Sequence, residues 1–274
     1  MELLDSLYVW LFGIIIPFSI LFLGAATGYT ISYLYYLIIF IGINLFIFGL
    51  YLFKKKRLIE DIPTSKIRSI AMGLVEIFGE VVPIKDKILK SPFTKKDCVY
   101  YKYFIEELRM KGKSLEWVPI KIGEDRTLFY LQDGTGSVLV DPKGANIEVS
   151  PSFSFESGMG KDPPEEVRRF LLENKINFED FFGINKSMKF TEYCIPIKSR
   201  LYIIGTAGDN PFVKEGWAQE GTEDVMIQKG ENIYFISNKS EKEILKNLKF
   251  QSIVFLFIGS ILIIAGVYLL FFLV

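Results

Sequence analysis

The chain has 274 residues, with 32 basic and 32 acidic side chains, two cysteines and no histidine. The lack of histidine excludes Ser-His-Asp and Cys-His catalysis, and two cysteines cannot supply the four Cys or His ligands of a structural zinc site. The balanced charge argues against nucleic-acid binding, which usually needs a basic face. We therefore expect no catalytic residues, no cofactor and no metal, and we expect Cys98 and Cys194 to be small buried side chains on strands.

The N-terminal segment, residues 1–57, begins with an uncharged stretch that runs from Ser6 to Phe53. One transmembrane helix needs about 20 apolar residues, so this stretch predicts a hairpin of two membrane helices, at about 7–24 and 31–53. A cleaved signal peptide fits poorly, because the apolar run is too long and no basic residues precede it.

A basic cluster ends this segment and consists of Lys54, Lys55, Lys56 and Arg57. Basic residues at the end of a membrane helix stay in the cytoplasm, so the cluster predicts a cytoplasmic N-terminus and a cytoplasmic end of the second helix. We interpret the four residues as a membrane-surface anchor. Recruitment of anionic lipid is the alternative interpretation.

The middle segment, residues 58–239, is expected to form a soluble, mostly antiparallel β domain. Its strand-like runs lie at 73–82, 98–105, 127–131, 137–140, 146–149, 188–197, 201–206, 225–228 and 233–237, with a turn at 229–232 between the last two. Asp133 and Gly134 lie between two apolar runs, which predicts a β-hairpin. A phosphate-binding loop is disfavoured, because no helix with a Lys-Ser/Thr pair follows.

One helix is expected within this β domain. Asp162 precedes two prolines and two glutamates, which predicts a helix with Asp162 as its N-cap and its end near Asn174. A second, short helical piece is expected at 178–182, ended by Gly183. Many short strands with one inserted helix predict a small barrel of the OB (oligonucleotide/oligosaccharide-binding) type.

The last segment, residues 240–274, predicts a stalk helix that continues into a third transmembrane helix. Ser240 and Glu243 fit a capping box, and no charged residue occurs from Phe250 onward. The expected fold class is therefore a membrane-anchored α+β protein with three transmembrane helices and a mostly antiparallel β domain. The expected protein is multi-pass in the cell membrane, with the β domain in the cytoplasm and the C-terminus outside.

Five blocks of the β domain, in the same order, resemble a known family. They lie at 62–76, 91–101, 133–142, 192–196 with 205–207, and 235–240. Together they resemble the "beside-a-membrane" domain of the GIDE (MULAN/MAPL-type) family of membrane-anchored E3 ubiquitin ligases, over roughly 62–248. The resemblance implies a domain that holds partners near the bilayer.

The sequence also departs from that family. The ligases carry a RING finger after their last helix, and two cysteines without histidine cannot build its two zinc sites. We therefore expect that ligase activity does not carry over, that this chain is not an enzyme, and that it is a prokaryotic, archaeal relative.

The polar residues that fall in the matching blocks are the candidate interaction surface: Arg68, Asp133, Asp141 and Glu192. The alternative is that they cap turns or form an ion pair that closes the barrel. The expected function is a scaffold that presents the β domain at the cytoplasmic membrane surface, with the lipid bilayer and other membrane or membrane-associated proteins as partners.

Three other functions remain open at this point. The first is a component of a ubiquitin-like E3 ligase system that acts with a separate RING subunit. The second is a barrel that binds single-stranded nucleic acid, which the charge balance disfavours. The third is an accessory of a membrane protease.

Overall fold

The computed structural model describes residues 30–272, except 86, 180–182, 184, 213–221 and 232. The chain forms two compact units, one made of Met1–Asp61 with Glu241–Val274 and the other of Ile62–Ser240. We call the first the helical unit and the second the β unit. The transmembrane helix predicted at 7–24 lies outside the described residues.

The described part of the helical unit consists of two long helices, α3 (Thr30–Glu60) and α5 (Glu241–Phe272). Both contain a segment long and apolar enough to cross a membrane, Leu34–Glu60 and Glu241–Phe271. The helix predicted at 31–53 is therefore present, and α5 runs without a break from Glu241, as the sequence predicts. The described residues hold two such helices rather than the three expected.

Glycines bring the backbones of α3 and α5 into contact. They are spaced one heptad apart on each helix, Gly42 and Gly49 on α3 and Gly259 and Gly266 on α5. A Cβ atom added at Gly259 would lie 2.7 Å from the backbone nitrogen of Phe46 and 2.8 Å from the carbonyl oxygen of Gly42. Small residues at such contacts are typical of helix pairs in membranes.

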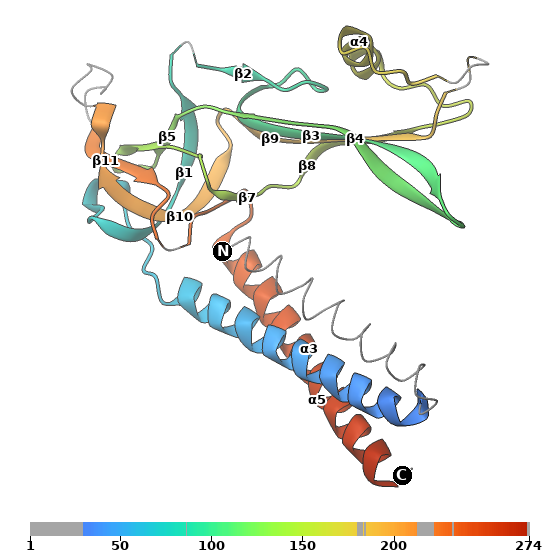
Figure 1. Ribbon diagram of the computed structural model, residues 1–274. Coiled ribbons are helices and arrows are strands. Elements are labelled where there is room, and N and C mark those ends of the chain that lie inside the picture. Colours follow the sequence, from blue (N-terminus) through green and yellow to red (C-terminus); the bar gives the residue numbers. More distant parts are fainter. Residues whose placement is uncertain are drawn as a thin grey trace. The chain divides into compact units, whose positions relative to one another are not determined.

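The β unit contains a mostly antiparallel barrel (Figure 1). Its strands are β1 (Gly73–Pro83), β5 (Phe129–Gln132), β6 (Ser137–Val140), β10 (Arg200–Asp209) and β11 (Thr222–Gln228). The hydrogen-bonded pairs β1–β5, β5–β6, β6–β11, β11–β10 and β10–β1 close a circuit. Only the pair β6–β11 is parallel.

Alternating side chains fill the barrel. Ile77, Phe129, Val138 and Ile203 are fully buried in one apolar cluster, as the period of two along a strand requires. The predicted hairpin around Asp133 and Gly134 is confirmed, because β5 and β6 pair antiparallel on either side of it.

Two further short strands extend the barrel sheet. β12 (Phe235–Ser237) pairs with β10 beside β11, and β7 (Asn146–Glu148) pairs parallel to β12. The segment 229–232 was expected to be a turn between two strands, but the chain does not reverse there. Instead β11 and β12 follow one another along the same edge of β10, both antiparallel to it.

A second, open sheet is built from two insertions into the barrel. Its strands are β2 (Leu89–Lys90), β3 (Asp97–Lys111), β4 (Ser114–Arg126), β8 (Pro151–Ser157) and β9 (Met188–Pro196). β3 lies between β4 and β9, and β8 lies beyond β9. The sequence did not predict β4 or β8, and it predicted a shorter β3.

The helix α4 (Glu165–Glu173) packs against this open sheet (Figure 1). Its buried Val167 and Leu171 join a cluster with Ile105 and Phe190. The prediction that Asp162 is its N-cap is wrong, because Pro164 occupies that position. The residue before a proline avoids the helical conformation, so two prolines in a row delay the helix start to Glu165.

Other parts of this region agree only partly with the sequence-based expectation. α4 ends at its C-cap Asn174, as predicted. Glu179 forms an isolated β-bridge with Asn185 rather than part of a short helix, and the rest of the piece expected at 178–182 lies outside the described residues.

Candidate functional site

Two of the four residues predicted to form an interaction surface meet at the β5–β6 turn. The carboxylate of Asp133 accepts hydrogen bonds from the N–H groups of Thr135, Gly136 and, at 3.1 Å, Ile67. The N–H of the exposed Arg68 donates to the hydroxyl oxygen of Thr135 at 3.2 Å. The turn therefore holds the short 3-10 helix η2 (Ile67–Ser69) against the barrel.

The protonation of Asp133 reflects these contacts. Burial works to raise its pKa, but the hydrogen bonds from the Thr135 side chain and from three backbone N–H groups outweigh this and lower the pKa below its usual value. Asp133 is thus an ionised group that caps a turn. An open pocket of about 440 Å³ lies beside it and is lined in part by Phe78, Glu80 and Arg200.

Glu192 lies in the interior and cannot form part of an exposed surface. It is fully buried on β9, where its carboxylate accepts hydrogen bonds from the N–H of Phe93 at 2.6 Å and from the N–H and hydroxyl of Thr94. The Ser152 hydroxyl also lies within hydrogen-bonding distance, at 3.3 Å. Glu192 therefore orders the turn between β2 and β3, which corrects the expectation of a surface residue.

The fourth predicted residue, Asp141, lines a second pocket, away from Asp133. This rim pocket has a volume of about 700 Å³ and is lined by Arg126, Thr127, Leu128, Asp141, Lys143, Gly144 and Phe212. The end of β4, the segment after β6 and the segment after β10 meet there. The four predicted residues therefore occupy three separate places rather than one surface.

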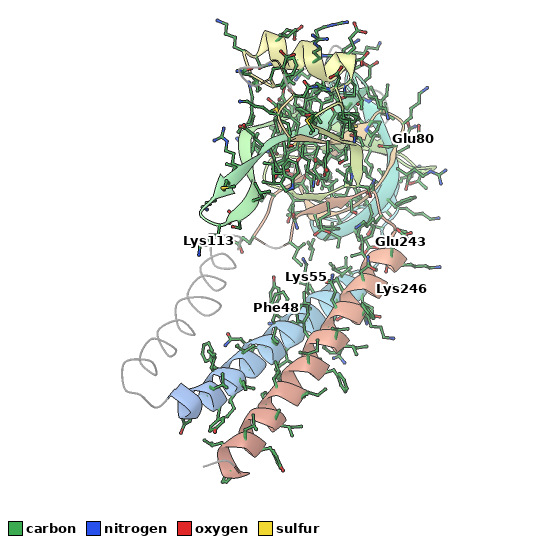
Figure 2. The ribbon with its side chains drawn as sticks, turned by 90° about the vertical axis from the view of Figure 1, so that its right-hand side faces the viewer. Phe48, Lys55, Glu80, Lys113, Glu243 and Lys246 are labelled. Atoms are coloured by element: carbon green, nitrogen blue, oxygen red, sulfur yellow. The ribbon has the colours of Figure 1, made fainter. Side chains whose placement is uncertain are left out.

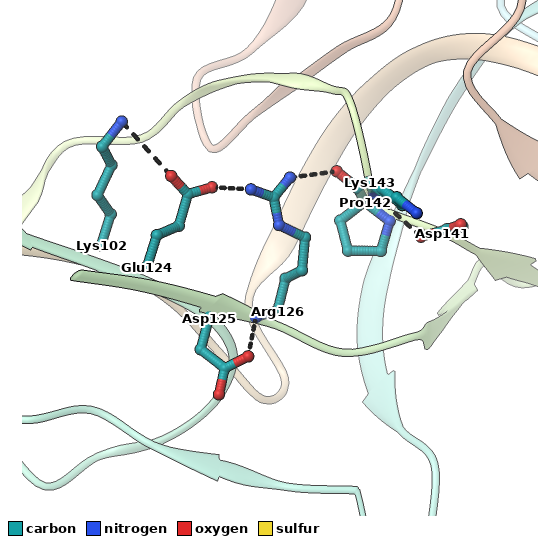
Figure 3. A network of polar contacts seen from close by, with 7 residues as sticks. All are labelled: Lys102, Glu124, Asp125, Arg126, Asp141, Pro142 and Lys143. Carbon is teal, nitrogen blue, oxygen red and sulfur yellow. Dashed lines mark hydrogen bonds and ion pairs between the residues drawn. The ribbon is translucent and has the colours of Figure 1, made fainter.

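Polar contacts hold the rim pocket in shape (Figure 3). The guanidinium of Arg126 forms an ion pair with Glu124 and donates a hydrogen bond to the carbonyl oxygen of Pro142 at 3.3 Å. Lys102 approaches the other oxygen of Glu124 at 3.6 Å. The Asp141 carboxylate accepts the N–H of Lys143 at 3.0 Å, which fixes the loop after β6.

Two apolar residues that line the rim pocket, Leu128 and Phe212, rest on the outer face of the barrel, and we call them its apolar floor. Tyr130, Leu139 and Met226 point outward from β5, β6 and β11, and all three are buried in a small cluster against which Leu128 and Phe212 pack. The rim pocket thus combines an apolar floor, a neutralised arginine and an exposed lysine. These groups can bind a chain segment, but they include no nucleophile paired with a base.

The basic cluster predicted as a membrane-surface anchor lies within α3, which continues to Glu60. Lys56 forms an ion pair with Glu60 at 2.5 Å, and the guanidinium of Arg57 lies 5.0 Å from the ring centre of Phe53. Figure 2 shows Lys55 on the same helix. The cluster therefore lies on the end of the helix that leads into the β unit.

The two cysteines are buried and reduced, Cys98 on β3 and Cys194 on β9. Burial raises the pKa of both thiols, that of Cys98 to about 12, so neither is a ready nucleophile. Among the described residues no group of three or more His, Cys, Asp or Glu side chains is placed to hold a metal ion.

Sequence reasoning missed most of the rim pocket. Arg126 and Phe212 lie outside the five blocks that resemble the known family, and Lys143 follows directly after the third. The one available signal was an arginine directly before the strand run predicted at 127–131.

The described part of the chain thus defines an α+β protein, with a mostly antiparallel β barrel and two helices that could cross a membrane. A family model described as GIDE, E3 ubiquitin ligase, matches residues 106–271, more than half of the chain, and the chain belongs to this family. The resemblance seen in the sequence is confirmed, although the match begins after the first two blocks. Neither curated proteins nor solved structures gave a match.

Proposed function

We propose that this chain is a membrane-anchored scaffold whose β unit binds partners at the cytoplasmic surface of the membrane. The observation that carries the proposal is the exposure of α3 and α5. Only 17% and 11% of their most apolar stretches are buried, whereas the core helix of a soluble protein is mostly buried. Exposed apolar surface of this extent calls for lipid around it.

Chain connectivity supports a tether at both ends. α3 ends at Glu60 and the β unit begins at Ile62, while the β unit ends at Ser240 and α5 begins at Glu241. A residue spans at most about 3.5 Å, so membrane-embedded helices would keep both ends of the β unit close to the bilayer. Such a tether raises the effective concentration of the unit for partners in the same membrane.

Basic residues support the proposal that the β unit lies on the cytoplasmic side of the membrane. They lie at the ends of both helices that join the β unit, Lys54–Arg57 on α3 and Lys242, Lys246 and Lys249 on α5. Positively charged residues next to membrane helices favour the cytoplasm.

We propose the rim pocket as the place where a partner's chain segment binds. Its apolar floor suits an apolar side chain, and the exposed Lys143 suits an acidic one. The test is a detergent pull-down of the full chain from its native membranes, with mass spectrometry of the bound proteins. The proposal expects a membrane or membrane-associated protein, lost with Lys143→Glu and kept with the matched variant Lys90→Glu on β2.

A partner set that is identical for both lysine variants would contradict binding in the rim pocket. Preparations that contain only the bait would contradict the scaffold itself.

A role in protein modification is the second candidate, because the family description names an E3 ubiquitin ligase. This role would need a RING subunit on another chain, since the sequence has two cysteines and no histidine. Co-purification of a RING protein or a ubiquitin-like modifier would favour it over a general scaffold.

Nucleic-acid binding has less support. We infer an OB-type barrel from the five-strand circuit, and OB barrels bind their ligands on the face of strands two and three. Here those strands are β5 and β6, whose outward side chains Tyr130 and Leu139 are already buried in a cluster with Phe212. Support for nucleic-acid binding would require that the chain changes the electrophoretic mobility of single-stranded DNA, and that added salt weakens this change.

A further inference from the structure

The β3–β4 hairpin continues beyond the open sheet as a two-stranded ribbon. The pairing of β3 with β9 ends at Glu107, whereas the pairing of β3 with β4 continues to Lys111 and Ser114. Gly112, with a φ angle of +66°, and Lys113 form the loop at the tip. We call residues 108–117 the ribbon, and Figure 2 shows Lys113 at its end.

One face of the ribbon is apolar. The cross-strand pairs Leu108–Trp117 and Met110–Leu115 lie at alternate positions, so all four side chains share this face. Toward the tip, Met110 is 77% exposed and Leu115 is 62% exposed. Neither side chain belongs to the buried apolar clusters described for the β unit, so most of their apolar surface faces the solvent.

The other face and the tip are basic. The ribbon carries Arg109, Lys111 and Lys113 against a single acidic residue, Glu116. Arg109 and Lys111 form ion pairs with Glu107 and Glu116, at 2.6 Å and 3.5 Å. No ion pair involving Lys113 is found among the described residues, so its charge is available to an external anion.

We propose that the tip of the ribbon binds the surface of an anionic lipid bilayer, with Met110 and Leu115 among the acyl chains and Lys113 at the headgroups. Elements that lie in a membrane interface combine an apolar face with lysines, and tryptophan is enriched at that depth. The net positive charge of the ribbon complements anionic lipid. The inference rests on the proposed membrane tether, which keeps the β unit near a bilayer.

Trp117 provides a direct readout. The other two tryptophans, Trp10 and Trp217, can be replaced by phenylalanine in the full chain, which leaves Trp117 as the only one. This variant is placed in nanodiscs of phosphatidylcholine and phosphatidylglycerol, with or without bromine on the upper acyl chain, since bromine quenches tryptophan on contact. We expect a loss of Trp117 emission in brominated discs, and a smaller loss when phosphatidylglycerol is omitted.

Three variants test whether the quenching of Trp117 depends on the ribbon. The double substitution Met110→Ser, Leu115→Ser should abolish the quenching, and Lys113→Glu should weaken it in anionic discs. Met159, which is 84% exposed elsewhere on the β unit, gives the matched control, and Met159→Ser should leave the quenching unchanged. All these residues are exposed, so the substitutions leave the core intact.

Several outcomes would overturn the inference. Equal emission in brominated and plain discs, from a chain that has entered the discs, overturns the lipid contact but leaves the tether standing. A protein partner that is lost with the double serine variant, without any quenching, would assign the ribbon to that protein instead. A chain that does not enter nanodiscs overturns the proposed tether, and with it the inference.

Discussion

The barrel and the open sheet of the β unit differ in how they treat the edge strands of a sheet, whose unpaired backbone groups can pair with another chain. The barrel closes on itself, and part of its outer face is buried with Phe212. The open sheet leaves β4 as an edge strand, with Pro119 and several charged residues along it, and extends into the exposed ribbon. Proline and charge protect an edge from unwanted pairing.

We infer from this difference that the barrel provides most of the stability of the β unit and that the ribbon provides recognition. The barrel contains the larger apolar core, whereas the open sheet has a smaller one and a buried carboxylate, Glu192, that holds the turn before β3. We therefore expect substitutions in the barrel to unfold the protein, and substitutions in the ribbon to change binding alone.

The largest effect is expected from Gly79→Ala in the barrel. A Cβ atom there would lie 2.5 Å from the carbonyl oxygen of Gln132, which cannot move without breaking the β1–β5 pairing. We expect a loss of about 3 kcal/mol or more in the free energy of unfolding, measured by urea denaturation of the full chain in detergent.

The matched control is Gly134→Ala, because a Cβ atom at Gly134 meets no atom within 4 Å. Equal stability of the two variants would contradict the closed barrel.

The next effect is expected from Glu192→Ala in the open sheet. The substitution leaves the N–H groups of Phe93 and Thr94 without their acceptor, at a cost of about 2–4 kcal/mol. The control is Glu156→Ala on β8, a half-exposed residue whose ion pair with Lys189 is long, for which we expect a change of less than about 0.5 kcal/mol. A Glu192→Ala protein as stable as wild type would show that this turn does not need its carboxylate.

A smaller effect, which depends on pH, is expected from Asp133→Asn at the barrel turn. The hydrogen bonds lower the folded-state pKa below the unfolded value of about 3.9, so the carboxylate stabilises the fold above that pH. This contribution is lost as the pH falls through the folded-state pKa. We expect a difference of about 1 kcal/mol at pH 7 that disappears in acid, measured by unfolding at a series of pH values.

A difference that stays constant down to the lowest pH would mean that the charge of Asp133 does not stabilise the turn.

The smallest effect concerns the cysteines on β3 and β9 of the open sheet, whose neighbours Val99 and Ile195 join the barrel core. Burial raises the pKa of Cys98 to about 12, so its thiolate is scarce at pH 8 and its sulfur is inaccessible. We expect no alkylation by iodoacetamide in the folded chain and complete alkylation in urea, as measured by intact mass. Alkylation without urea would show that the folded β unit opens around the buried Cys98.

Local signals in the sequence predicted some of these features correctly. The Asp133-Gly134 hairpin and the start of α5 follow from turn and capping chemistry within a few residues, and both are present. The strand β4 was missed because Pro119 and Gly123 interrupt its pattern, and its pairing with β3 is what keeps it extended. Two prolines gave the wrong N-cap for α4, because their effect on the preceding residue outweighed the capping tendency of Asp162.

The candidate site was harder to predict than the fold. A glutamate within a matching block suggests a surface residue, yet Glu192 is buried because the turn that it binds comes from a distant part of the chain. The rim pocket likewise joins segments after β4, β6 and β10, and no sequence spacing reveals that meeting. The ribbon was missed together with β4.

The central claim, a β unit tethered to the membrane at both ends, can be tested by cutting the tethers. Protease sites are inserted after Asp61 and after Ser240 in the full chain, and isolated membranes are cut at one site or at both and washed in high salt. The account predicts that the β unit stays with the membranes after either single cut and is released only after both. Release after one cut, or before any cut, would contradict it.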